Sequence, residues 1–128
     1  MRIKRSVDIE DVIRTALNEH ITAYCRPLPK EYRLPNILVT QVGGADRNNI
    51  DSFEVVLDAR AKTEETASLT LRNAIGILKE IAAEQSTAIR YITVNTNGSW
   101  DFDPVRPDLA LCTARIRVTA HMENVEVN

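Results

Sequence analysis

The sequence predicts an α+β fold of two layers, with two helices packed on one face of a four-stranded, mainly antiparallel sheet. Two segments carry apolar residues at steps of three and four, the period of an amphipathic helix. Four others are rich in β-branched residues or alternate apolar with polar side chains. Their order is α-β-β-α-β-β, and a right-handed crossover through the second helix then buries every apolar stripe.

The first helix is predicted over residues 7–24. Ser6 or Asp8 can accept a hydrogen bond from the free amides of its first turn. The segment 25–35 that follows contains three prolines, so neither a helix nor a central strand can run through it. The apolar stripe of the helix consists of Ile9, Val12, Ile13, Ala16, Leu17, Ile21 and Tyr24.

The first two strands are predicted from "NILVTQV" and "SFEVVLDARA", which a turn through "GGADRNN" joins into a hairpin. Gly43 and Gly44 are expected to supply positive φ angles and to let the chain bend. In the second strand one face meets the core and the other is partly wet. The core face carries Phe53, Val55, Leu57 and Ala59, and the other face carries Glu54, Val56, Asp58 and Arg60.

The second helix is predicted over residues 63–85, with Thr63 as its N-cap and two glutamates in its first turn. A third strand follows in "AIRYITVNT", then a long turn in "NGSWDFDPVRPD", then a fourth strand in "LALCTARIRVTAHM". Small apolar residues alternate there with polar and basic ones. The sheet face away from the helices is therefore expected to stay open and to suit contact with another subunit.

The composition is that of an ordinary globular protein, and residues 1–128 are expected to form a single domain. A net charge of -2 gives no overall field for gripping nucleic acid or an acidic membrane. Cys25 and Cys112 lie far apart and outside any CxxC spacing, which favours reduced thiols and synthesis in the cytoplasm. No segment has the apolar length of a membrane span.

The sequence gives little support for a catalytic or metal-binding function. Asp101 and Asp103 in "DFDP" could face a divalent cation, but such an ion needs about six oxygen ligands and the vicinity adds only Asp108 and carbonyl groups. "VGGADRN" lacks a phosphate-binding motif, and no local signature supports a Cys–His pair with His20 or His121. We therefore expect no catalytic residue, no cofactor and no metal site. A small metal-dependent enzyme using Asp101, Asp103 and His121 remains an alternative.

Three segments that cover residues 34–121 follow one another in a distinctive order: "LPNILVTQVGG", "SFEVVLDARAKTEETASLTLRNAIGILKEI" and "GSWDFDPVRPDLALCTARIRVTAH". This order resembles the tail terminator proteins of long-tailed bacteriophages and prophages. Sequences of that family similarly join a glycine-ended hairpin to an alanine-rich helix, and then show a tryptophan and Asp-Pro loop before a terminal strand. Because these signatures are structural, the resemblance implies a virion protein and not an enzyme.

The resemblance implies a subunit of a ring, commonly a hexamer, that caps the tail tube at its full length and presents a surface for joining the DNA-filled head. Its partners would be other copies of itself, the tail tube protein and the head–tail connector protein, with packaged DNA nearby and no membrane. It would be made in the host bacterial cytoplasm and reside in the neck of the virion. The nearest alternative is a head–tail adaptor or tail-completion protein on the portal side.

Carried onto this sequence, the resemblance implies two groups of contact residues. The first group is the hairpin tip, Gly43, Gly44, Asp46 and Arg47; the second is the later loop, Trp100, Asp101, Asp103, Pro104 and Arg106. Within the second group, Trp100 is either folded back onto the domain or inserted into a partner, since large aromatic residues often anchor interfaces. In addition, Arg60, Arg115 and Arg117 on the open face would contact a neighbouring subunit or line the channel.

Overall fold

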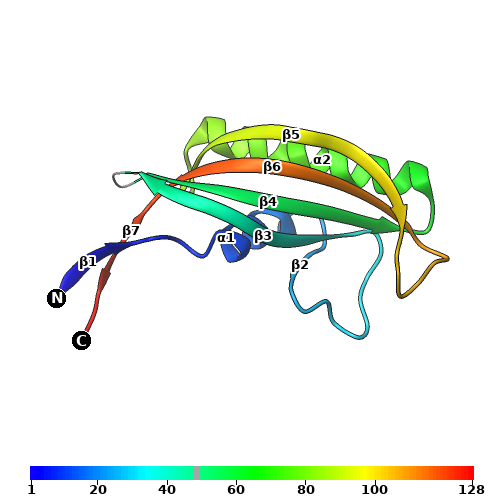
Figure 1. Cartoon of the computed structure of the whole chain (residues 1–128), viewed down its shortest axis with the longest axis horizontal. Coiled ribbons are helices and arrows are strands. Elements are labelled where there is room, and N and C mark those ends of the chain that lie inside the picture. The colour runs from blue at the N-terminus through cyan, green and yellow to red at the C-terminus, as the bar shows by residue number, and fades with distance from the viewer. Residues whose placement is uncertain (48–49) are drawn as a thin grey trace.

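The structure is a computed structural model. It describes the backbone of residues 1–47 and 50–128, and the side chains of these residues except 46, 47, 96–99, 101 and 102. The main sheet has the strand order β2-β3-β4-β6-β5, and β1 pairs with β7 in a separate sheet (Figure 1). The elements are β1 (Arg2–Arg5), α1 (Ile9–Asn18), β2 (Ala23–Cys25), β3 (Asn36–Arg47), β4 (Ile50–Ala61), α2 (Glu64–Glu84), β5 (Ile89–Phe102), β6 (Ala110–His121) and β7 (Glu123–Glu126).

The hydrophobic core lies between the helices and one face of the main sheet. Buried residues of α1, α2 and the strands form one cluster, and α1 packs against both α2 and β3. β4 and β6 alternate buried residues with more exposed ones over most of their length, as predicted. Each fully buried aliphatic side chain contributes about 1.5–3 kcal/mol relative to exposure. The α+β class and the order of the main elements are thus confirmed.

The number of strands differs from the prediction, because the main sheet has five strands and not four. The extra strand β2 pairs in parallel with Ile37–Val39 of β3. It occupies the end of the predicted first helix, which instead stops at Asn18. The Asn18 side chain accepts a hydrogen bond from the Ala23 amide at 2.8 Å and turns the chain into the strand. Ile21 and Tyr24 continue the helical spacing, so periodicity alone does not reveal this turn.

The third predicted strand is also longer, because β5 runs on through Trp100 to Phe102. Trp100 pairs with Cys112 and Phe102 with Ala110, so the predicted turn from residue 97 is a continuation of the sheet. Three shifts of register interrupt the β5–β6 ladder. Such bulges break the alternation of side chains, which is why the polar stretch after Thr96 reads as a turn in the sequence.

The two glycines of the hairpin lie within β3, which continues through them to Arg47, with a bulge between Gln41 and Gly43. Neither glycine has the expected positive φ. A Cβ atom on Gly44 would instead lie 2.8 Å from the backbone oxygen of Ser52. Gly44 is therefore required by the close approach of β4. The rest of the predicted turn, residues 48 and 49, lies outside the described residues.

The chain ends form the two-stranded sheet, which was not predicted. β1 and β7 lie side by side beyond the hairpin end of the main sheet (Figure 1). The Met1 amino group bonds Glu126 at 3.0 Å, and Arg5 bonds Glu123 at 2.7 Å. The basic "RIKR" and acidic "ENVE" segments have opposite charges, which favours their pairing as neighbouring strands. Because the two segments lie at opposite ends of the sequence, no local pattern indicates that they pair.

We predict that Gln85→Gly raises the free energy of unfolding by about 0.5–1 kcal/mol. Gln85 caps the C-terminus of α2 in the left-handed conformation, with φ 56° and ψ 33°. Glycine adopts this conformation without the clash of a Cβ atom. Urea denaturation measures the difference. The control Glu84→Gly, within the last turn of the helix, should instead lower stability by about 1 kcal/mol.

We predict that Gly44→Ala lowers the free energy of unfolding by about 1–3 kcal/mol, because the new methyl group meets backbone that cannot move without breaking the ladder. Gly43→Ala is the matched control. A Cβ atom on Gly43 would lie an ordinary 3.7 Å from the nearest atom of Glu54, so this variant should stay within about 0.5 kcal/mol of the wild type. Equal stability of the two variants in thermal or urea unfolding would contradict the proposed packing.

Candidate assembly surfaces

The sheet face opposite the helices carries interacting polar side chains. Arg117 donates to Glu54 Oε1 from Nε at 2.8 Å and from Nη2 at 2.6 Å. The second oxygen of Glu54 accepts from Asn95 at 3.1 Å, and Thr113 donates to Asp58 at 2.6 Å. These groups remain hydrated and would be costly to bury without partners. The face therefore cannot hold a second core, but it can meet another polar surface.

The three arginines expected on this face have different environments. Arg115 and Arg117 are exposed, as the alternation of β6 predicts. Arg60 is buried, and its Nε donates to Asp103 Oδ2 at 2.7 Å. The loop after β5 covers this end of β4 and removes Arg60 from the exposed surface. Arg60 therefore fixes the loop and does not present its charge to a channel or a neighbouring subunit.

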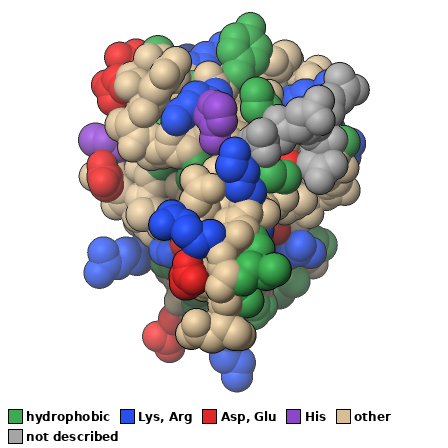
Figure 2. Space-filling view, turned by 90° about the vertical axis from the view of Figure 1, so that its left-hand side faces the viewer, with side chains coloured by type: hydrophobic (Ala, Val, Ile, Leu, Met, Phe, Trp, Pro, Cys, Tyr) green, Lys and Arg blue, Asp and Glu red, His purple; other side chains and the backbone are tan. Residues whose placement is uncertain are grey.

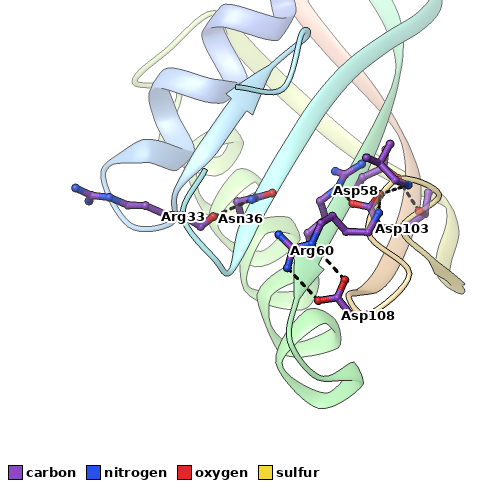
Figure 3. A network of polar contacts seen from close by, with 9 residues as sticks. Arg33, Asn36, Asp58, Arg60, Asp103 and Asp108 are labelled. Atoms are coloured by element: carbon purple, nitrogen blue, oxygen red, sulfur yellow. Dashed lines mark hydrogen bonds and ion pairs between the residues drawn. The ribbon is translucent and has the colours of Figure 1, made fainter. Parts of the chain in front are cut away.

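Asp103 holds the loop that joins β5 to β6. Besides the bond from Arg60, its carboxylate accepts from the amides of Val105 at 2.9 Å and Arg106 at 3.2 Å (Figure 3). Burial disfavours the charged carboxylate, but the hydrogen bonds from Arg60 and the two amides outweigh it, so the pKa of Asp103 lies below its ordinary value. Asp103, expected among the contact residues, is thus the buried anchor of the loop, while Pro104 and Arg106 are exposed.

A second buried polar side chain lies next to Arg60 in the sheet. Asn36 is the cross-strand neighbour of Arg60 and donates from Nδ2 to the Arg33 carbonyl at 2.8 Å. Among the described residues, Asn36 Oδ1 and Arg60 Nη1 have no hydrogen-bond partner. Asn36 thus fixes the segment before β3 beside Arg60.

The hairpin end carries a shallow hollow of about 510 Å³, which Gly44, Ile50 and Ser52 help to line. Asp51 also borders it and is only 2% exposed; neither carboxylate oxygen has a partner in the described part of the chain. Figure 2 looks onto this end of the molecule, where, among the side chains that the structure describes, basic and acidic ones are interspersed. Gly43 is half-buried and Gly44 exposed, whereas the side chains of Asp46 and Arg47 lie outside the described residues.

The two groups of expected contacts lie at opposite ends of the sheet. β6 begins at Ala110 beside the Asp103 loop and ends at His121, which pairs with Ile50 at the hairpin. A strand of this length spans roughly 36 Å. Asp103 and His121 therefore cannot share a metal ion, which removes the arrangement on which the metal-dependent alternative rested. The side chain of Asp101 is outside the described part of the chain.

Trp100 lies on the helix side of β5 and not in a loop. Its side chain borders a hollow of about 440 Å³ against the start of α2, together with Leu69 and Arg72. Trp100 is 48% exposed and Leu69 is 50% exposed. Trp100 is therefore half-exposed beside the first turns of α2, neither fully buried nor in a loop, and its contact with a partner stays a prediction. Leu69 was not predicted as a contact, although it falls outside the apolar stripe of its helix.

The described residues offer no group of three or more His, Cys, Asp or Glu that could hold a metal ion. Cys25 and Cys112 are free, and burial raises the pKa of both thiols, which disfavours the nucleophilic thiolate. Within the same residues, neither helix is both long and apolar enough to cross a membrane. No known family model matches the chain, and a comparison with curated proteins finds no similar sequence. Its function must therefore be inferred from the surfaces themselves.

We predict that Asp103→Asn lowers the free energy of unfolding at neutral pH by about 3–5 kcal/mol, because it leaves Arg60 buried without a counter-charge. Asp108→Asn is the control, since the Arg106–Asp108 pair is exposed and should contribute little. Urea denaturation of both variants measures the effect. An Asp103→Asn variant as stable as the wild type would contradict the role of this pair.

The same variant gives a prediction for pH. The folded-state pKa of Asp103 is lowered, so its contribution to stability is complete above the unfolded value of about 3.9 and is lost as pH falls through the folded value. The difference in stability between wild type and Asp103→Asn should therefore be constant near neutral pH and should shrink in acid. A difference that grows as the pH falls would contradict this assignment.

Proposed function

We propose that the chain is a structural subunit of a ring that caps the phage tail tube, ends tail polymerisation and provides the surface for head joining. The resemblance of residues 34–121 to tail terminators supports this proposal. The geometrical observation that carries it is that the main sheet has two unlike ends and one open polar face. Its two ends, separated by the length of β6, bear different surfaces, and no described helix or strand covers its polar face.

Two different ends suit a protein that lies between two unlike bodies. The hairpin end offers a wide, shallow hollow and exposed Ile50, while the other end offers a loop held by the buried Arg60–Asp103 pair. One heterologous contact repeated around an axis closes a ring and aligns both ends of every subunit. One side of such a ring would meet the tail tube and the other the head connector.

Arg115 and Arg117 would face a neighbouring subunit or the channel in this proposal. Arg117 is already paired with Glu54, and the interspersed charges give no strong positive field. Tight DNA binding requires many uncompensated contacts to phosphates. A weakly charged lining suits a passage that must let the genome slide, because each bound phosphate would hold it back.

Negative-stain imaging of the purified protein with tail tubes, assembled from the tube protein encoded nearby, tests the proposal. We expect rings at one tube end and shorter tubes when the protein is present during assembly, because a capped end cannot add subunits. Tubes assembled without it are the control. Binding to a portal or connector but not to the tube would favour the head–tail adaptor, and binding to neither would contradict the proposal.

A further inference from the structure

The loop between β5 and β6 projects an apolar side chain into solvent. Val105 is 85% exposed and lies between Pro104 and Arg106. Arg106 binds Asp108 through Nε at 3.2 Å and Nη2 at 2.9 Å. The loop surface thus presents an exposed valine that precedes the paired Arg106 in sequence. We call Val105, Arg106 and Asp108 the loop knob.

The backbone under the knob is held in place before any partner arrives. The Asp103 carboxylate accepts hydrogen bonds from the amides of Val105 and Arg106, and the Leu109 amide donates to the Arg106 carbonyl at 2.9 Å. Pro104 and Pro107 further restrict the φ angles of this segment. A segment that is already ordered loses little conformational entropy on binding. An exposed valine on a rigid support is therefore well suited to dock into a preformed hollow.

A hollow with complementary character lies at the same end of the molecule. Trp100 and Leu69 contribute apolar surface to its lining, Glu64 and Glu65 contribute carboxylates, and Arg72 contributes a guanidinium. Its charges therefore match the knob, with acidic groups available for Arg106 and a basic group for Asp108. In Figure 1, the loop between β5 and β6 projects from the sheet to the side away from α2. The residues that line the hollow come instead from the first turns of α2 and from Trp100 of β5. We call this surface the α2–β5 hollow.

We propose that the loop knob of one copy docks into the α2–β5 hollow of the next copy, with Val105 between Trp100 and Leu69. Arg106 then faces Glu64 and Glu65, and Asp108 faces Arg72. This proposal rests on the proposed function in taking a second copy of the chain as the occupant, and the matching charges of the two surfaces support that choice. Since the Arg106–Asp108 pair is exposed, exchanging it for partners on a neighbour has a small cost.

The contact is heterologous, because the knob and the hollow are different surfaces on different sides of one subunit. Each subunit then donates one knob and accepts another, and repetition of the contact gives a ring if the rotation closes. The valine of the same chain cannot fill the hollow, since it is 85% exposed. A free hollow and a free knob on every isolated subunit are what such an assembly requires.

Two variants, Val105→Asp and Leu69→Asp, test the contact in the full chain by sedimentation velocity. Each places a carboxylate in the apolar centre of the interface and should weaken self-association at least about tenfold. A mixture of the two should form heterodimers, because the intact knob of one still fits the intact hollow of the other. The control Val127→Asp makes the same change at an exposed valine near the chain end and should associate like the wild type. Circular dichroism verifies that each variant is folded.

Several outcomes would overturn the inference. Wild-type self-association in either variant, or a mixture without heterodimers, would show that knob and hollow do not meet. A wild type that remains monomeric, with no disulfide between a Val105→Cys subunit and a Leu69→Cys subunit under oxidising conditions, would also refute it. Variants that form capping rings like the wild type would refute this interface and leave the proposed function standing. If the wild type associates with itself but does not bind tail tubes, and the variants lose this self-association, the interface would stand and the proposed function would be refuted.

Discussion

The alternation of side chains along β4 and β6 is the constraint on which the rest of the structure depends. These two strands lie at the centre of the main sheet, and their apolar residues point to one face over most of their length. Both helices must therefore cover that face, since no other surface can bury their own apolar stripes. The opposite face receives Glu54, Asp58 and Arg117, which bond one another or nearby polar groups. One-sided burial thus creates the open face as a direct consequence of the strand pattern.

Arg60 and Asp103 extend this constraint to the end of the sheet. A buried ion pair gains little over apolar residues of similar volume, because both charges lose their hydration. Its geometric effect is larger, since Asp103 also accepts two amides of the loop and Arg60 comes from a central strand. The loop therefore has the rigidity of the sheet and not that of a free connection. Val105 stays exposed at the tip of the loop because these hydrogen bonds leave its backbone few alternative conformations.

Sequence periodicity predicted the parts of the fold whose side chains repeat regularly. The faces of β4 and β6, the extent of α2 and its Thr63 cap follow from local patterns, and the structure confirms them. β2 is only three residues long and follows a helical spacing, and the bulges of β5 hide its second half. The β1–β7 pairing joins segments from opposite ends of the chain, and no local signal reports it.

Candidate site residues were predicted less well for the same reason. Residue type alone singles out Trp100 and the Asp-Pro loop, since a lone tryptophan and closely spaced prolines are unusual, but their role as contacts stays a prediction. The burial of Arg60 by a loop that begins at Asp103 depends on tertiary structure, as does the position of Leu69 beside Trp100. The opposite placement of hairpin and loop follows from strand lengths, which were underestimated where glycines and bulges interrupted the pattern.

The edges of the main sheet limit how copies of the chain can associate. An exposed strand edge can pair with another strand, and bulges and covering groups oppose this. β5 forms one edge and contains three register shifts. At the other edge, β2 covers the first part of β3, and Glu10 accepts the amide of Gln41 at 2.8 Å. Both edges are therefore poor templates for strand addition. In the proposed ring, lateral contacts would then rely on side-chain surfaces, and the loop knob and the α2–β5 hollow are the complementary pair that we propose for them.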